Sequence, residues 1–127
     1  MREILFRGQR VGSEEWVEGF YLTSPEFDNQ EVAVITTDKP RNPYYVSKET
    51  IGQYTGLTDK NGTKIFEGDI VNIYYPKVKV ENTVISYIGA SFYGDRFDDA
   101  WELDNYYQLE VIGNIHDNLE LLKERDN

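Results

Sequence analysis

Cysteine is absent from this 127-residue sequence, and histidine and methionine occur once each. Without cysteine the chain has no disulfide framework and no thiolate chemistry, which suits a reducing compartment. A Ser-His-Asp triad would have to use His116, which lies in "GNIHDN" and far in sequence from any G-x-S-x-G elbow. We therefore expect neither thiol nor serine-hydrolase chemistry, and we place His116 on the surface near the start of a helix.

Long apolar runs and phosphate-binding glycine loops are also missing. No apolar stretch approaches the roughly 18 residues that span a bilayer, and no secretory apolar region follows the first residues. Neither G-x-x-x-x-G-K-[ST] nor G-x-G-x-x-G occurs, so a nucleotide cofactor is not expected. These absences predict a soluble protein of the cytoplasm without cofactors and without a membrane partner.

Positive charge is scarce, since the formal net charge is −10. Residues 95–127 hold ten acidic and three basic side chains, which places about −7 of this charge in the C-terminal third. Such a balance repels phosphate backbones and disfavours general nucleic-acid binding. Two nucleic-acid-directed alternatives stay open: an acidic DNA mimic that captures a host DNA-binding protein, or phosphate contacts made by Arg2, Arg7, Arg10 and Arg41.

Short runs rich in Val, Ile, Tyr, Phe and Thr dominate the chain, with Gly, Asn, Asp or Pro clusters every eight to twelve residues. This spacing is typical of a barrel or sandwich. The length predicts one domain over residues 1–127, with two β-rich lobes, about 1–50 and 51–127, as the alternative. The strands expected from this pattern are 3–7, 16–22, 31–37, 69–75, 78–88 and 108–112, with an acidic loop over 94–106.

A short helix is predicted at the end of the chain. Asp117 followed by Glu120 has the form of a capping box, and Leu119 and Leu122 provide an apolar stripe at i, i+3. We expect the helix to cover 118–124 and to close one end of the core.

The stretch "GQYTGLTDKNGTKIFEGDIV", residues 52–71, combines glycines and acids in a pattern typical of turns. Asp59-Lys60-Asn61-Gly62 fits a type I turn that leads into a left-handed glycine, which would join 54–57 and 64–66 in a hairpin. Gly68 permits a second special backbone angle, and Asp69 can accept a hydrogen bond across it. The acid/base alternative for Asp59, Glu67 and Asp69 lacks a nearby histidine or metal-ligand spacing.

A cluster of acidic residues in the C-terminal third is compatible with a solvated loop or with an ion site. Its members are Asp95, Asp98, Asp99, Glu102 and Asp104. They do not follow the D-x-[DN]-x-[DN]-G spacing of a calcium loop, so we expect a solvated acidic loop and no metal site, with an ion site as the alternative.

Aromatic residues make up 14% of the sequence and often occur in adjacent pairs. Neighbours in a strand point to opposite faces, so one member of each pair would face outward and suit a protein interface. Core packing of both members explains the pairs equally well. The candidate interface residues are Trp16, Tyr45, Tyr75, Tyr93, Trp101 and Tyr107.

Three segments, "FRGQRV…EEWVEGFYL" at 6–22, "ETIGQYTGLTDKNGTKIFEGDIV" at 49–71 and "EVIGNIHDNLELL" at 110–122, resemble the YopX family of phage and prophage proteins. The resemblance implies a β-rich fold with SH3-like barrel character, a phage or prophage origin, action in the bacterial cytoplasm, and self-association. It supplies no catalytic residues. Its signature positions in this chain are Gly52, Gln53, Tyr54, Gly56, Asp59, Asn61, Gly62, Glu67, Gly68 and Asp69.

These observations together predict a mainly β protein with an SH3-like barrel and a short C-terminal helix. We expect a noncatalytic accessory protein that binds protein partners, including further copies of itself and a host or phage protein, through aromatic faces and strand edges.

Overall fold

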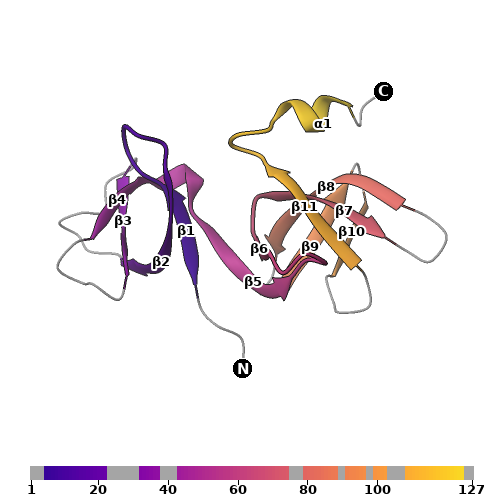
Figure 1. Cartoon of the computed structure of the whole chain (residues 1–127), viewed down its shortest axis with the longest axis horizontal. Coiled ribbons are helices and arrows are strands. Elements are labelled where there is room, and N and C mark those ends of the chain that lie inside the picture. Colours follow the sequence, from indigo (N-terminus) through magenta and orange to yellow (C-terminus); the bar gives the residue numbers. More distant parts are fainter. Residues whose placement is uncertain are drawn as a thin grey trace. The chain divides into compact units, whose positions relative to one another are not determined.

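The computed structural model describes residues 5–22, 32–37, 43–74, 79–88, 91–96, 99–102 and 108–124 (Figure 1). In chain order the elements are β1 (Phe6–Gln9), β2 (Trp16–Leu22), β3 (Val32–Thr36), β4 (Tyr44–Ser47), the 3₁₀ helix η1 (Lys48–Thr50), β5 (Gly52–Thr58), β6 (Lys64–Phe66), β7 (Asp69–Tyr74), β8 (Lys79–Ile88), β9 (Ser91–Arg96), β10 (Asp99–Glu102), β11 (Gln108–Asn114) and α1 (Glu120–Glu124).

The chain divides into two compact units, Met1–Tyr54 and Thr55–Asn127. In the first unit the antiparallel order is β4-β3-β2-β1-β5. Strand β5 continues into the second unit, where it neighbours β6. The second unit also contains an antiparallel sheet of order β10-β9-β8-β7-β11.

The first unit is a meander that packs around a small aliphatic core. Period-two alternation in β3 and β4 brings Ala33, Ile35 and Val46 to one side, where all three are buried. Partly buried side chains pack against this cluster: Val17, Tyr21, Tyr44 and Ile51. The outer edge of β4 is partly occupied, because Arg10 bridges to Val46 and Val11 N–H donates to the carbonyl of Tyr45 at 3.0 Å.

The second unit has an aliphatic core that packs against its five-stranded sheet. Val71 and Ile73 on β7 pack with Ile85 on β8 and Leu109 on β11, and Ile65 of β6 joins them. Thr83 lies opposite Val71 in the register and is fully buried. Its Oγ1 has no hydrogen-bond partner in the described part of the chain, so this core contains one unsatisfied hydroxyl.

The C-terminal helix α1 begins at Glu120, two residues later than the sequence predicted. The expected capping box is wrong, because the Asp117 N–H donates to Asn114 Oδ1 at 2.9 Å instead of to Glu120. The helix is attached to β8 by Asn82, whose Nδ2 donates to the carbonyl of Leu121 at 2.9 Å. Within the described residues, no helix is long and apolar enough to cross a membrane.

The prediction of a mainly β fold with a short C-terminal helix is confirmed. The acidic loop expected over 94–106 is wrong, since β9 and β10 occupy much of it and pair antiparallel. Their charged residues are compatible with strands because β10 lies at the edge of its sheet, where charged residues are tolerated and discourage pairing with other chains. The sequence pattern did not predict strand β4. The strand pairings of the described residues form two antiparallel sheets and do not close a barrel.

Candidate functional site

The turn that follows β5 has the predicted geometry. Gly62 N–H donates to the carbonyl of Asp59 at 3.0 Å, and Asp59 N–H donates to the carbonyl of Thr63 at 2.8 Å. Gly62 has φ +83°, a value that a residue with a side chain rarely adopts. The expected type I turn with a left-handed glycine is confirmed, and it joins β5 to β6.

The Asp59 carboxylate holds this turn together and also ties it to a distant strand. Its Oδ1 accepts the backbone N–H groups of Asn61 and Thr63, both at 2.9 Å, and its Oδ2 accepts the N–H of Val111 on β11, also at 2.9 Å. Lys60 N–H donates to the carbonyl of Leu109 at 2.9 Å. We call these four bonds the Asp59 latch.

The latch covers part of the open edge of the second sheet. Strand β11 is terminal in the order β10-β9-β8-β7-β11, so the backbone groups on its outer side need partners other than a neighbouring strand. The carboxylate of Asp59 takes the Val111 N–H and the Lys60 N–H takes the Leu109 carbonyl. The turn thus replaces the pairing that another strand would provide.

Asp59 is only 7% exposed, yet the pKa of its carboxyl group is not raised above its usual value. Burial acts to raise the pKa of Asp59, but the backbone N–H bonds from Val111, Thr63 and Asn61 outweigh it and leave the pKa below its usual value. A general base needs a pKa near the working pH and free lone pairs. The geometry therefore favours a structural role for this carboxylate.

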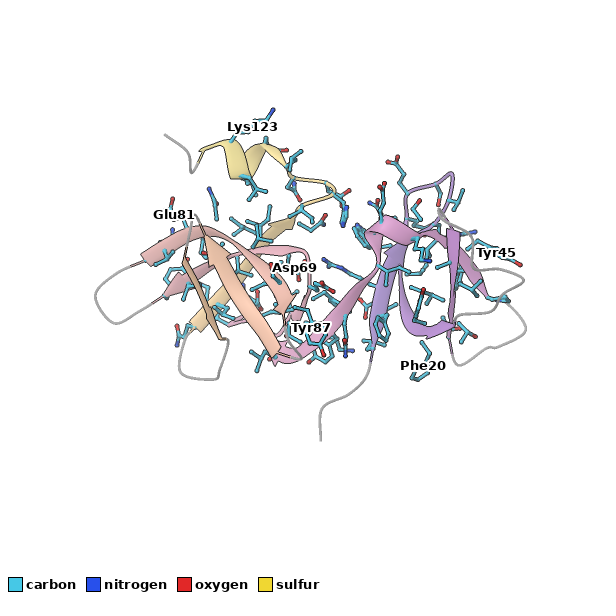
Figure 2. All side chains as sticks on the ribbon, turned by 180° about the vertical axis from the view of Figure 1, so that it is seen from behind. Phe20, Tyr45, Asp69, Glu81, Tyr87 and Lys123 are labelled. Atoms are coloured by element: carbon cyan, nitrogen blue, oxygen red, sulfur yellow. The ribbon has the colours of Figure 1, made fainter. Side chains whose placement is uncertain are left out.

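The second turn of the segment contains Gly68 and Asp69. Gly68 has φ +92°, which bears out the special backbone angle expected there. Asp69 is 1% exposed, and its Oδ2 accepts the N–H of Phe66 at 2.8 Å across the turn. Figure 2 shows Asp69 among the strands of the second unit. Gly68 N–H donates to Ile85 and its carbonyl accepts from Ile115, so this turn connects β8 to the end of β11.

The other signature residues lie along β5 and the β6–β7 turn. Gly52 and Gln53 pair with Arg7 and Phe6 of β1. Tyr54 is 6% exposed, and its N–H donates to the carbonyl of Leu5 at 2.7 Å. Gly56 is exposed and has φ +88°, while Glu67 is half-buried. The signature is thus spread over several elements instead of converging on one site.

The candidate interface residues fall into three groups. Tyr45 is 48% exposed, whereas Trp16 is half-buried beneath the guanidinium of Arg7, 4.6 Å from its ring centroid. Tyr93 and Trp101 lie on β9 and β10, and the placement of their side chains is not described. Tyr75 and Tyr107 lie outside the described residues.

Two exposed apolar residues of the first unit escaped the sequence reasoning. Phe20 is 56% exposed on β2 and Val11 is 54% exposed in the β1–β2 loop. Phe20 and Tyr45 project outward at different places of this unit (Figure 2). Strand alternation could have identified Phe20, because its neighbours Gly19 and Tyr21 face the other side.

The arginines proposed for phosphate contacts are engaged with aromatic rings where they are described. Arg7 stacks on Trp16, and Arg10 lies 5.1 Å from the ring centroid of Tyr44 while its Nη1 pairs with Glu15 at 3.4 Å. Arg2 and Arg41 lie outside the described residues. The proposed constellation of four arginines is therefore not assembled in the part of the chain that the structure describes.

The other polar candidates do not form a metal site within the described residues. His116 is exposed, and its N–H donates to Asn114 Oδ1 at 2.9 Å in the loop before α1. Asp98 and Asp104 lie outside the described residues, and the side chains of Asp95, Asp99 and Glu102 are not described. Elsewhere in the described ranges, no group of three or more His, Cys, Asp or Glu residues could hold an ion.

A polar cluster beside the latch was not predicted. The Tyr74 hydroxyl donates to Glu110 Oε1 at 2.7 Å, and Lys60 Nζ lies 3.7 Å from Glu110 Oε2. The hydrogen bond from Tyr74 lowers the pKa of Glu110, and the charges of Lys60 and Lys79 lower it further against the effect of burial. Because these residues are far apart in sequence, only the strand register brings them together.

The fold and the Asp59 turn define a class of protein. It is mainly β, it has two units, and the turn hydrogen-bonds to the edge strand β11 of a sheet. The sequence profile of the YopX family, described as YopX protein, matches residues 5–123, so the chain belongs to the YopX family. The predicted resemblance is confirmed. The crystal structure of protein EF1440 from Enterococcus faecalis is similar, with 28% identity, a TM-score of 0.62 and coverage of 96% of this chain and 99% of that chain. No curated protein matches the chain.

Proposed function

We propose that this YopX-family chain is a noncatalytic phage or prophage accessory protein. It acts in the bacterial cytoplasm as an interaction module that binds further copies of itself and other proteins. The observation that carries this proposal is the exposure of large apolar side chains on the first unit, with Val11 at 54%, Phe20 at 56% and Tyr45 at 48%. Aromatic side chains such as those of Phe20 and Tyr45 are enriched at the centres of protein interfaces.

The first unit is, in this proposal, an SH3-like barrel. Four features support it: a meander of four antiparallel strands, the 3₁₀ helix η1 after β4, a fifth strand that returns to pair with β1, and the bridge from Arg10 to Val46 across the remaining gap. Small barrels of this type commonly bind partners on exposed aromatic surfaces between loops.

The noncatalytic role is supported by the environment of the two signature aspartates. The oxygens of Asp59 hold three backbone N–H groups, and Asp69 is buried with Phe66 N–H on its Oδ2. Carboxylates whose oxygens accept backbone N–H groups in this way stabilise the conformation of the turn. We expect Asp69→Ala to destabilise the fold without abolishing a chemical turnover. A robust hydrolase or nuclease activity that disappears in Asp69→Ala, with an unchanged circular dichroism spectrum, would refute the noncatalytic role.

Val11 and Tyr45 are neighbouring exposed apolar residues of the first unit. The Val11 N–H bonds to the Tyr45 carbonyl at 3.0 Å, so the two residues lie side by side, and we call them the Val11–Tyr45 patch. The net charge of −10 opposes association at long range, but screening over about 8–10 Å at physiological salt leaves short-range apolar burial to decide. A stable dimer would bury about 1,200–2,000 Å² in total, so the patch would be the centre of a larger contact.

Sedimentation velocity at several concentrations and two salt levels tests the association. We expect species heavier than the 14.8 kDa chain, with a population that rises with concentration. Tyr45→Ser should shift this population toward the monomer. Leu119→Ser is the matched control, because Leu119 is 54% exposed in the second unit and should leave the distribution unchanged. A single 14.8 kDa species from micromolar to millimolar concentration would refute self-association.

A further inference from the structure

The tip of the Asp59 turn carries an asparagine followed by glycine. Asn61 and Gly62 are both exposed to solvent. The backbone N–H of Asn61 donates to Asp59 Oδ1 at 2.9 Å, and a Cβ placed on Gly62 would meet no atom within 4 Å. Water therefore reaches this pair.

Asparagine followed by glycine can lose ammonia without an enzyme. The backbone nitrogen of Gly62 attacks Cγ of Asn61, a new C–N bond forms, and the bond from Cγ to the side-chain nitrogen breaks. The proton of the Gly62 N–H leaves with that nitrogen as ammonia, and a five-membered succinimide remains. Water then opens either carbonyl of the ring, which gives aspartate or an isoaspartyl linkage at residue 61. Glycine favours the first step because it has no side chain to obstruct the attack.

The native turn opposes the ring closure. The attacking nitrogen is the one whose N–H donates to the Asp59 carbonyl at 3.0 Å, and the next residue, Thr63, is held by Asp59 Oδ1 at 2.9 Å. To reach Cγ, the Gly62 nitrogen must rotate about the Asn61 backbone and give up this hydrogen bond. Bonds from the carboxylate to Val111 and from Lys60 to Leu109 resist that rotation, because they attach the turn to β11.

We infer that Asn61 is a deamidation site that the Asp59 latch keeps inactive in the native fold. Its conversion then depends on opening of the turn. An isoaspartyl linkage adds one backbone carbon between residues 61 and 62, so Thr63 N–H can no longer meet Asp59 Oδ1 in the same geometry. Conversion to the isoaspartyl form is thus a one-way loss of the latch, which exposes the edge of β11 at Val111.

The experiment follows ammonia loss at Asn61 by peptide mass spectrometry. The full chain is incubated at one mildly alkaline pH and one temperature, in native buffer and in concentrated urea. Two variants are incubated in native buffer: Asp59→Asn, which weakens the latch, and Asn82→Ala, which removes the bond to Leu121 but leaves the latch intact. Cleavage after Lys60 separates residue 59 from Asn61, so the two positions are read independently, and Asn61→Ser sets the background.

We expect conversion in the native chain to be at least about tenfold slower than in urea, since ring closure requires several hydrogen bonds to break. Asp59→Asn should speed conversion in native buffer, whereas Asn82→Ala should not. Equal rates for the native and urea-treated chain would overturn the inference, as would an Asn61 that stays intact in urea. If Asp59→Asn does not fold, the comparison of the parent chain in buffer and urea still decides.

Discussion

Replacing Asp59 by alanine removes the carboxylate that joins the turn to β11. The N–H groups of Asn61 and Thr63 lie in an exposed turn, so water can accept the hydrogen bonds that they lose with the carboxylate. The N–H of Val111 lies in a partly buried strand, and it loses a charge-assisted bond. Counting about 1.5–3 kcal/mol for the Val111 bond and about 0.5–1 kcal/mol for the turn, we expect Asp59→Ala to lower the free energy of unfolding by roughly 2–4 kcal/mol.

Thermal and urea unfolding followed by circular dichroism measure this change. A loss of this size corresponds to a drop in Tm of roughly 10 °C for a chain of this length. The matched control is Asp117→Ala, which removes the same charge from an exposed loop where Asp117 Oδ2 accepts a 3.2 Å bond from Asn114. We expect that control to stay within about 0.5 kcal/mol of the parent. An Asp59→Ala variant as stable as Asp117→Ala would refute the latch.

The contribution of Asp59 also depends on pH. Its pKa in the folded chain is lower than in the unfolded chain, where it is about 3.9. The stabilisation is therefore complete above that value and is lost as the pH falls through the folded pKa. The stability difference between the parent and Asp59→Ala should shrink below about pH 4. A difference that stays constant down to pH 2 would show that ionisation of Asp59 does not matter.

Four further substitutions test the surrounding geometry, each by thermal melts. Gly62→Val and Gly68→Val should each cost about 1–3 kcal/mol because both glycines have positive φ, and unchanged Tm values would contradict these conformations. Gly113→Ala should also destabilise, since its Cβ would lie 2.6 Å from Asn118 Oδ1, and the cost should fall when Asn118 is alanine. Thr83→Val should raise stability by about 1 kcal/mol by removing an unsatisfied buried hydroxyl, and a lower Tm would reveal a partner for that hydroxyl.

The local features of the fold were predictable because they depend on residues close in sequence. The strand 16–22 matches β2, and the turns at Gly62 and Gly68 follow from glycine's access to positive φ. The mainly β class follows from short β-type runs separated by turn residues. The start of α1 was missed because Asn114 and Asn118, not Asp117, bond to the backbone groups before the helix.

The long-range features could not be derived from one sequence. Asp59 and Val111 are 52 residues apart, and turn chemistry explains the bonds to Asn61 and Thr63 without indicating the bond to β11. Strands β9 and β10 were read as a loop because acidic residues dominate the local pattern, while the pairing that forms the hairpin is not visible in it. Exposure of Val11 likewise depends on how the β1–β2 loop is placed beside β4.

Hydrogen exchange at the Val111 amide tests most directly whether the signature segment is a structural latch. The Val111 N–H should be strongly protected in the parent chain, because it donates to Asp59 Oδ2 at 2.9 Å. In Asp59→Ala it should exchange much faster, while the amide of buried Ile73 stays protected. A Val111 amide that exchanges at the unprotected rate in the parent, or that is equally protected in both chains, would contradict the latch and reopen a binding role for the segment.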